Sequence, residues 1–402
     1  MKLSISKGYL FIFFLVMISG TIVSRPLLEY LPLILFCFIT LFYGVPGNFF
    51  FKKYFIYISI LLIVFILQRI FLGYVSVLGS INFFLKIYIA AFLFYKLGNK
   101  FRQIYFNVIY FFSIVSIFFF TVFVVTGYPV SIIEYPNFHS IIIFNIKYDL
   151  NGAYIMRNCG PFWEPGAFVG YIIFALLLYI DDLKGVYKRN KFKFLTIILA
   201  LITTFSTTGY IIILFWFIVM YLTKEKKQII IWLFGFFIVT ILVGYSIYKI
   251  PFLRDKITSQ TEVALMSSDN NEFNGERLGA LLFDLYYIKK HPLIGNGWHA
   301  KTRYADHPYL MEQELNGTIG NGNGFSTFLA SMGIVFVLIY FYKINKTLPL
   351  TTKYRFIFIT TLVLLYQGEQ FLYYPLFISL PLLNIYRLYE KKNINSSIIN
   401  LS

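Results

Sequence analysis

Long apolar runs recur along the whole 402-residue chain, and they limit its fold more than any other feature. Hydrophobic residues make up 58% of the sequence and charged residues only 13%, which excludes an ordinary soluble protein. Many runs approach or exceed the roughly 18 residues that cross a bilayer as a helix. Strands of a membrane barrel would alternate between apolar and polar residues, so unbroken runs of Phe, Ile and Leu indicate helices. We therefore expect an all-α, polytopic transmembrane helix bundle.

Hydropathy divides the chain into about twelve expected spans. They cover residues 9–23, 27–45, 54–73, 77–97, 104–126, 165–181, 193–206, 208–222, 228–249, 323–342, 354–369 and 371–388. Two divisions are narrow, since only Thr203-Thr-Phe-Ser-Thr-Thr-Gly209 separates the seventh and eighth spans and only Gly368-Glu-Gln370 separates the last two. A single kinked helix is the alternative in each place.

Clusters of Lys and Arg predict the orientation of these spans. Basic residues recur in every second connection, as in Lys52-Lys53, Lys184 to Lys193 and Lys224 to Lys227, whereas the short connections between them carry almost none. Both termini are therefore expected in the cytoplasm. The net charge of +17 then reflects segments that face an anionic inner leaflet, and nucleic acid is not an expected partner.

The whole chain, residues 1–402, is expected to form a single integral membrane domain with two long outer segments. They cover residues 127–164 and 250–322, the second lying between spans nine and ten, and together they contain all four histidines. Long loops without spans of their own are usually functional. Charged residues inside the spans are few, with Arg69 and Lys86 as the candidates, whereas a transporter is expected to bury ionisable groups there.

Four motifs lie in or beside the outer segments. The stretch Arg157-Asn-Cys-Gly-Pro-Phe-Trp-Glu164-Pro-Gly166 crowds a cation, an acid and two aromatic rings against the start of a span. Residues 277–290 place Leu278, Leu281, Leu282, Leu285 and Ile288 at helical spacing, which predicts an amphipathic helix. A tight turn, His291-Pro-Leu-Ile-Gly-Asn-Gly297, follows this helix. Finally, Asn323-Gly-Phe opens the tenth span, where free N–H groups suit an anion.

In this order the motifs resemble those of the O-antigen polymerase and ligase superfamily. The resemblance covers about residues 150–340 by motif and the whole chain by topology. Its carriers are Arg157 with Phe162-Trp-Glu164-Pro-Gly166, the bend at Ser206, Arg277 followed by Lys290-His-Pro-Leu-Ile-Gly-Asn-Gly297, and Asn323-Gly-Phe followed by Met332-Gly333. The resemblance implies a GT-C-like glycosyltransferase of the bacterial inner membrane that acts at the periplasmic face on glycans carried by undecaprenyl pyrophosphate.

Within that superfamily, the ligase branch usually has a His-Asn pair before the tenth span, where this chain has Gly322-Asn323. The difference favours the polymerase branch, which joins lipid-linked repeat units into O-antigen or a related surface polysaccharide. Two alternatives stay open. One is an O-antigen ligase that transfers the glycan to lipid A core, and the other is a lipid-linked oligosaccharide flippase, which is expected to line a central cavity with basic residues.

The reaction implied by the resemblance expels undecaprenyl pyrophosphate, and arginine is well suited to stabilise the developing charge on a diphosphate. We predict that Arg157 and Arg277 bind the pyrophosphate and that Trp163 and Asn323 contribute to the glycan site. Glu164 is the first candidate for the base that activates the acceptor hydroxyl, and His299 is the second. No metal or other cofactor is expected. The expected partners are the lipid-linked oligosaccharide, the lipid membrane and a chain-length regulator protein.

Structural roles compete with each of these functional ones. Arg157 can pair with Glu164, and Arg277 can be a surface residue beside Glu276. Glu164 can favour the dipole of the helix that follows Pro165. His299 can be a polar loop residue.

The charge pattern predicts the membrane topology. A fluorescent protein fused after Ser402 is expected to fluoresce, because that tag folds in the cytoplasm, and alkaline phosphatase inserted between residues 250 and 322 is expected to be active. Phosphatase inserted between Lys184 and Lys193 serves as the inactive control. An active enzyme at that control position would contradict the orientation.

Overall fold

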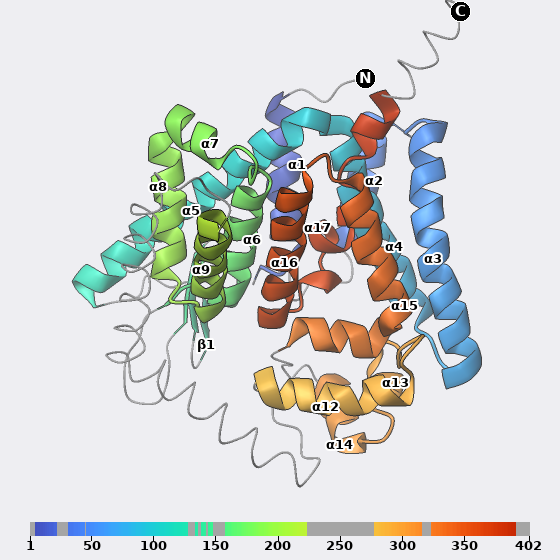
Figure 1. The fold of residues 1–402 in the computed structure, drawn as a ribbon. Helices are drawn as coiled ribbons and strands as arrows, with labels where there is room; N and C mark the ends of the chain where they lie inside the picture. The colour runs from blue at the N-terminus through green and yellow to red at the C-terminus, as the bar shows by residue number, and fades with distance from the viewer. Residues whose placement is uncertain are drawn as a thin grey trace, which may run out of the picture. The chain divides into compact units, whose positions relative to one another are not determined.

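The computed structural model describes residues 5–21, 31–44, 46–127, 133–135, 138–141, 144–147, 157–222, 277–315 and 323–390 (Figure 1). These residues are mostly helical and belong to two compact units. The first unit combines Met1–Val108, Phe283–Pro349 and Gln370–Ser402, and the second combines Ile109–Leu282 and Leu350–Glu369. Both units are thus assembled from segments that lie far apart in the sequence.

Membrane character is evident in the helices. Three helical stretches of the described residues, Asn48–Leu72, Val77–Thr126 and Gly324–Thr347, are long and apolar enough to cross a membrane. Shorter apolar helices cover Lys7–Met17, Pro32–Leu41, Pro165–Leu177 and Thr207–Met220. The expected span at 228–249 lies outside the described residues, and the total of about twelve stays a prediction.

The helices of the first unit surround α4. The elements that lie wholly in this unit are α1 (Ile5–Met17), α2 (Leu31–Tyr43), α3 (Asn48–Leu72), α4 (Val77–Leu97), η2 (Gly98–Lys100), α13 (Ala300–Arg303), α14 (Pro308–Leu315), α15 (Gly324–Thr347), η4 (Phe371–Tyr373), α17 (Pro375–Ile378) and η5 (Leu380–Leu382). The second half of α4 is buried on all sides by α1, α2, α3 and α17. In contrast, α3 exposes a row of large apolar side chains that includes Ile63 and Ile70, as expected for a face in lipid.

The last expected span, residues 371–388, is wrong as a single helix. Pro375 and Pro381 each lack the N–H that would continue a helix, and the chain forms the short pieces η4, α17 and η5. Polar side chains take up the freed carbonyl groups: the Tyr57 hydroxyl donates to Ile378 O at 2.9 Å, and the Tyr340 hydroxyl donates to Phe377 O at 2.7 Å. Tyrosines of α3 and α15 therefore hold this irregular segment inside the first unit.

The tight turn expected at 291–297 is present, and it fits into a break of α15 at Gly333, where φ is 76°. Asn296 N donates to Ala330 O at 2.8 Å and Gly297 N donates to Ser331 O at 3.0 Å. The Gln68 amide of α3 also donates to Ser331 O, at 2.8 Å. A Cβ on Gly295 would collide with the Ser331 carbonyl group, and a Cβ on Gly333 would collide with that of Leu293. Only glycine allows the two backbones to approach this closely.

The second unit is built around α6. The elements that lie wholly in it are β1 (Ile133–Tyr135), β2 (Phe138–Ser140), β3 (Asn145–Lys147), β4 (Arg157–Asn158), α6 (Pro165–Leu177), α7 (Leu183–Arg189), α8 (Lys191–Thr203), α9 (Thr207–Leu222) and α16 (Thr352–Gly368). Every residue of α6 is buried, and α8, α9 and α16 pack against it. The narrow division between the seventh and eighth expected spans is a true break, since α8 and α9 are separate helices.

The expectation of an all-α fold is wrong within the outer segment 127–164. Strands β1 to β4 form an antiparallel sheet in that order, with Lys147 paired to Arg157. Short stretches such as Ile133-Glu-Tyr135 alternate apolar and polar residues, which suits a strand better than a helix. The sheet fixes the backbone of Arg157.

The helix expected at 277–290 is present as α12 (Arg277–Lys290), which continues from the second unit into the first. Its predicted apolar stripe is wrong at Leu285, which is exposed, whereas Phe283, Asp284 and Tyr287 are buried. The reason is an ion pair: the Asp284 carboxylate binds the Arg303 guanidinium and turns that face of the helix inward. The stretch Val77–Thr126 also includes α5 (Phe101–Thr126), which likewise belongs to both units.

The close backbone crossing predicts that Gly333→Ala lowers the stability of the protein by about 3 kcal/mol or more, because strain and collision add. Gly73→Ala is the matched control, since Gly73 has a similar φ of 73° with no atom within 4 Å of an added Cβ. It should show only the strain of about 1–2 kcal/mol. Thermal unfolding in detergent measures both. Equal losses in the two variants would contradict the crossing.

Candidate functional site

The predicted site residues fall in both units. Arg157, Trp163 and Glu164 belong to the second unit, whereas His299 and Asn323 belong to the first. Arg277 begins α12, and its side chain lies outside the described part of the chain.

Arg157 lies at the break between α8 and α9. Its side chain is 7% exposed, and it donates from Nε to Thr204 O and from Nη2 to Phe205 O, each at 3.3 Å. Phe205 has a positive φ of 47°, which a non-glycine residue rarely adopts. A cation at the C-terminus of a helix is favoured by its free carbonyl groups. Arg157 therefore has a structural role at this bend in addition to any role in binding.

The bend also buries a hydroxyl group. Ser206 is 1% exposed, and its Oγ has no hydrogen-bond partner within the described residues. Two of the predicted motifs, Arg157 and the Ser206 bend, are thus brought together. Asn158 fixes the strand beside them by donating to Thr203 Oγ1 at 2.9 Å and to Ser116 Oγ at 3.2 Å.

Glu164 and Trp163 precede α6 and are half-buried. Glu164 occupies the N-cap position with Pro165 after it, and its side chain makes no capping hydrogen bond. A second carboxylate that sequence reasoning missed also lies here, because a Cβ on Gly166 would meet Oε1 of Glu369. Negative charge is favoured at a helix N-terminus. The start of α6 therefore holds two acidic side chains, of which Glu164 can approach a substrate hydroxyl as a base.

His299 caps the short helix α13. Its Nδ1 accepts a hydrogen bond from Lys301 N at 3.2 Å, and its ring lies 4.7 Å from that of Tyr74. Burial, and then the charge of Lys301, lower the pKa of His299 below its usual value, so the imidazole is neutral at pH 7. A neutral ring that accepts at Nδ1 carries its proton on Nε2. This tautomer leaves no free nitrogen to take a proton, which favours Glu164 over His299 as the base.

Asn323 caps α15. Its Oδ1 accepts from Ser326 N at 3.0 Å, and the residue is 3% exposed. This hydrogen bond satisfies one N–H at the start of the helix. Asn323 thus has a clear structural role as the cap of α15, and its contribution to a glycan site stays a prediction.

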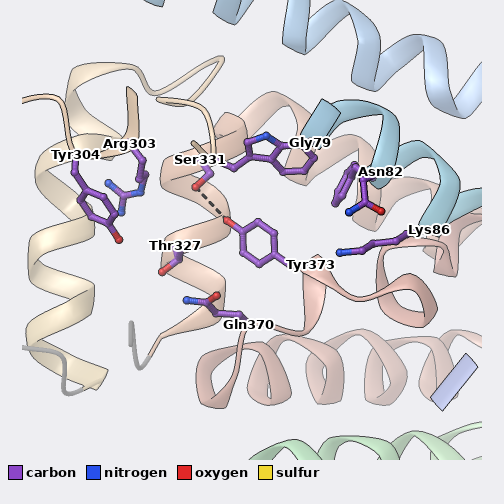
Figure 2. Close-up of a pocket in the computed structure, with 11 residues that line it drawn as sticks. Gly79, Asn82, Lys86, Arg303, Tyr304, Thr327, Ser331, Gln370 and Tyr373 are labelled. Atoms are coloured by element: carbon purple, nitrogen blue, oxygen red, sulfur yellow. Dashed lines mark hydrogen bonds between the residues drawn. The ribbon is translucent and has the colours of Figure 1, made fainter. Parts of the chain in front are cut away.

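The first unit contains a cavity of about 480 Å³ that the sequence did not reveal as a whole (Figure 2). Its lining combines cations, amides, hydroxyl groups and aromatic rings, supplied by Gly79, Asn82, Phe83, Lys86, Trp298, Arg303, Tyr304, Thr327, Ser331, Gln370 and Tyr373. The first four recur at the i, i+3, i+4 and i+7 spacing of a single helix face on α4. Lys86 was recognisable as a charge within a span, which is a functional signal by default.

Arg303 is anchored by a buried network behind the cavity. Asp284, at 0% exposure, forms an ion pair with Arg303 and accepts hydrogen bonds from Ser326 Oγ at 2.5 Å and from Thr327 Oγ1 at 3.1 Å. The guanidinium carbon of Arg303 lies 4.6 Å from the ring centroid of Tyr287, in cation–π contact. This pairing could not be predicted from the sequence, because Asp284 lies in the middle of α12 and 19 positions away from Arg303.

The fold and site together define a helical protein of membrane character with a cationic cavity. Among the described residues, no three His, Cys, Asp or Glu side chains are grouped so as to hold a metal ion. Comparison with the models of known protein families and with curated proteins gives no match. The functional assignment therefore depends on the residues themselves.

The buried ion pair predicts that Asp284→Ala destabilises the protein by about 3–5 kcal/mol, because Arg303 would be left buried and unpaired. Asp182→Ala is the control: the Asp182–Arg189 pair spans 2.6 Å but its side chains are 46% and 59% exposed, so its loss should change stability by less than about 1 kcal/mol. Unfolding of the purified variants in detergent measures both. A small effect at Asp284 would show that the network contributes little.

Proposed function

We propose that this protein is a membrane glycosyltransferase that polymerises oligosaccharide repeat units carried by undecaprenyl pyrophosphate. The polymer is O-antigen or a related surface polysaccharide, and the reaction takes place at the periplasmic face of the bacterial inner membrane. A chain-length regulator protein is the proposed protein partner.

The observation that carries this proposal is the lining of the cavity in the first unit. Lys86 and Arg303 suit an anionic group, whereas Asn82, Thr327 and Gln370 suit the hydroxyl groups of a sugar. Aromatic rings, including Trp298, can pack against the apolar face of a sugar ring or a lipid chain. A phosphorylated glycan on a lipid carrier is the ligand class that uses all three kinds of group in a protein of membrane character.

The chemistry assigns roles to the motif residues. The acceptor hydroxyl loses a proton as it attacks the anomeric carbon of the donor glycan, and the bond to undecaprenyl pyrophosphate breaks. In the proposal Glu164 takes that proton, and Arg157 and Arg277 stabilise the charge of the leaving diphosphate. Trp163 and Asn323 are proposed to contact the glycan, and no metal ion is required by these roles.

A flippase for the same lipid-linked oligosaccharide is the second candidate, and the same cavity is the observation that supports it. Basic residues that line a cavity are what such a carrier needs, and Lys86 and Arg303 provide them. An O-antigen ligase is the third candidate, and it differs from the polymerase in requiring lipid A core as the acceptor.

Lipopolysaccharide banding and carrier-linked glycans in a deletion strain separate the three. Loss of a polymerase leaves lipid A core with a single repeat unit, and loss of a ligase leaves bare core with polymer on the carrier. Loss of a flippase leaves bare core while single repeat units accumulate on the carrier in the cytoplasmic leaflet. An unchanged ladder would reject all three functions.

The same strain tests Glu164. We expect Glu164→Gln to reduce polymerisation by about 100-fold or more, since it removes the base and keeps the size of the side chain. Glu312→Gln is the control, because Glu312 is exposed on α14. Protein levels in the membrane are compared in both strains. A full ladder from Glu164→Gln would remove Glu164 from the mechanism.

A further inference from the structure

The cavity of the first unit carries two cations that the motif analysis did not use. Lys86 comes from the middle of α4 and Arg303 from the end of α13. Figure 2 shows them at opposite sides of the cavity, with Tyr373 between them in this view. The Tyr373 hydroxyl donates to Ser331 Oγ at 3.2 Å, which fixes the ring in place.

Arg303 has donors to spare. Its side chain is 3% exposed, and its ion pair with Asp284 uses Nη2. Nε and Nη1 are buried without a hydrogen-bond partner among the described residues. These atoms carry one and two N–H groups respectively. Since buried N–H groups of a charged side chain are rarely left unsatisfied, a ligand in the cavity is the natural source of acceptors.

Lys86 is half-buried and also has unused donors. Within the described part of the chain, its ammonium group makes no hydrogen bond or ion pair. Asn82, one turn earlier on the same face of α4, has a buried Oδ1 that also lacks a hydrogen-bond partner among the residues described. A ligand that satisfies these groups needs acceptors for the cations and a donor, such as a hydroxyl group, for Asn82.

The charge of the site selects an anion. Among the described residues, no carboxylate lines the cavity, and Asp284 behind Arg303 already binds Arg303, Ser326 and Thr327. The single negative charge of Asp284 thus offsets only one of the two positive charges of Lys86 and Arg303 that line the cavity, and the excess is positive. This excess attracts an anion strongly where the surroundings have a low dielectric constant.

The number of donors selects the kind of anion. Arg303 offers three free N–H groups and Lys86 offers three more on its ammonium group. A carboxylate has only two oxygens close together, so it cannot serve two cations on opposite sides of a cavity. A diphosphate has several charged oxygens distributed over two linked phosphate groups, and it matches the number of donors.

We propose that Lys86 and Arg303 bind a diphosphate group in this cavity and that Asp284 is the positioning residue for Arg303. That the diphosphate belongs to a lipid-linked glycan rests on the proposed function. That the cavity binds a diphosphate rests on the cavity alone. The source is either a lipid headgroup or a free diphosphate, and the two are separated by the probe.

Binding is measured on the purified full-length protein in nanodiscs by isothermal titration calorimetry with inorganic pyrophosphate, and by ligand-induced thermal stabilisation in nanodiscs containing undecaprenyl pyrophosphate. We expect saturable binding that weakens with added salt. Lys86→Met should weaken it by about tenfold or more, and Lys86→Arg should retain most of it, since the charge is kept. Lys96→Met is the control, because Lys96 lies over the Phe92 ring at the end of the same helix.

Arg303 is tested by Arg303→Lys, which keeps the charge beside Asp284 but removes the free Nε and Nη1 donors. We expect it to weaken binding of the diphosphate while the protein still elutes as a single species on size exclusion. Stabilisation by undecaprenyl pyrophosphate with no response to inorganic pyrophosphate supports a lipid headgroup, and the reverse supports a free diphosphate.

Two results would overturn the inference: binding by Lys86→Met with the affinity of the wild type, or no binding of either probe to the wild type. Neither depends on polymer formation. A strain that keeps a normal ladder after deletion of the gene would reject the polymerase while leaving diphosphate binding intact. Conversely, a polymerase whose Lys86→Met variant binds diphosphate normally would retain its function and lose this site.

Discussion

Broken helices in an apolar protein leave carbonyl groups that water cannot reach, and the described structure depends on side chains that satisfy them. In the first unit, the break of α15 at Gly333 is filled by the backbone of the 291–297 turn and by Gln68. In the second unit, Arg157 donates to the carbonyl groups of Thr204 and Phe205, which directly follow α8. These polar residues therefore serve first as partners of irregular backbone, and a functional role has to be shown beyond that.

This double use explains why the motif residues and the cavity differ. Asn323 was predicted from its place before the tenth span and His299 as a candidate base in the outer segment, and both cap helices through their own side chains. Arg303 and Lys86 form no such backbone contact within the described residues. Substitution of a polar group whose hydrogen bonds hold the fold can abolish function by disturbing the fold and not by removing a ligand contact. A group with unused donors can bind a ligand without any change in the fold.

The extent to which the sequence predicted the fold follows from the range of the interactions involved. Apolar runs are local, so α4 begins and ends at the residues expected for the span 77–97. The bend at Ser206 separates α8 from α9, which agrees with the prediction of two helices and not with that of one kinked helix. Prolines break the last expected span, and hydropathy alone cannot predict such a break. The inward face of α12 depends on Arg303, a partner 19 positions from Asp284, and no periodicity within the helix reveals it. The cavity joins α4 to residues more than 200 positions away, so its composition was out of reach even though Lys86 was visible as a charge within a span.

Arg157 and Lys86 show two ways in which a cation can be held in an apolar unit. Arg157 donates to carbonyl groups that would otherwise be unsatisfied, so its burial contributes to the stability of its own unit. Lys86 receives no such compensation within the described residues, and its desolvation opposes folding. An anion that fills the cavity would remove that penalty, and anything that binds the folded state alone also stabilises it. Stability and occupancy of the cavity are then linked through Lys86, and loss of its charge should raise the stability of the empty protein while lowering that of the occupied one.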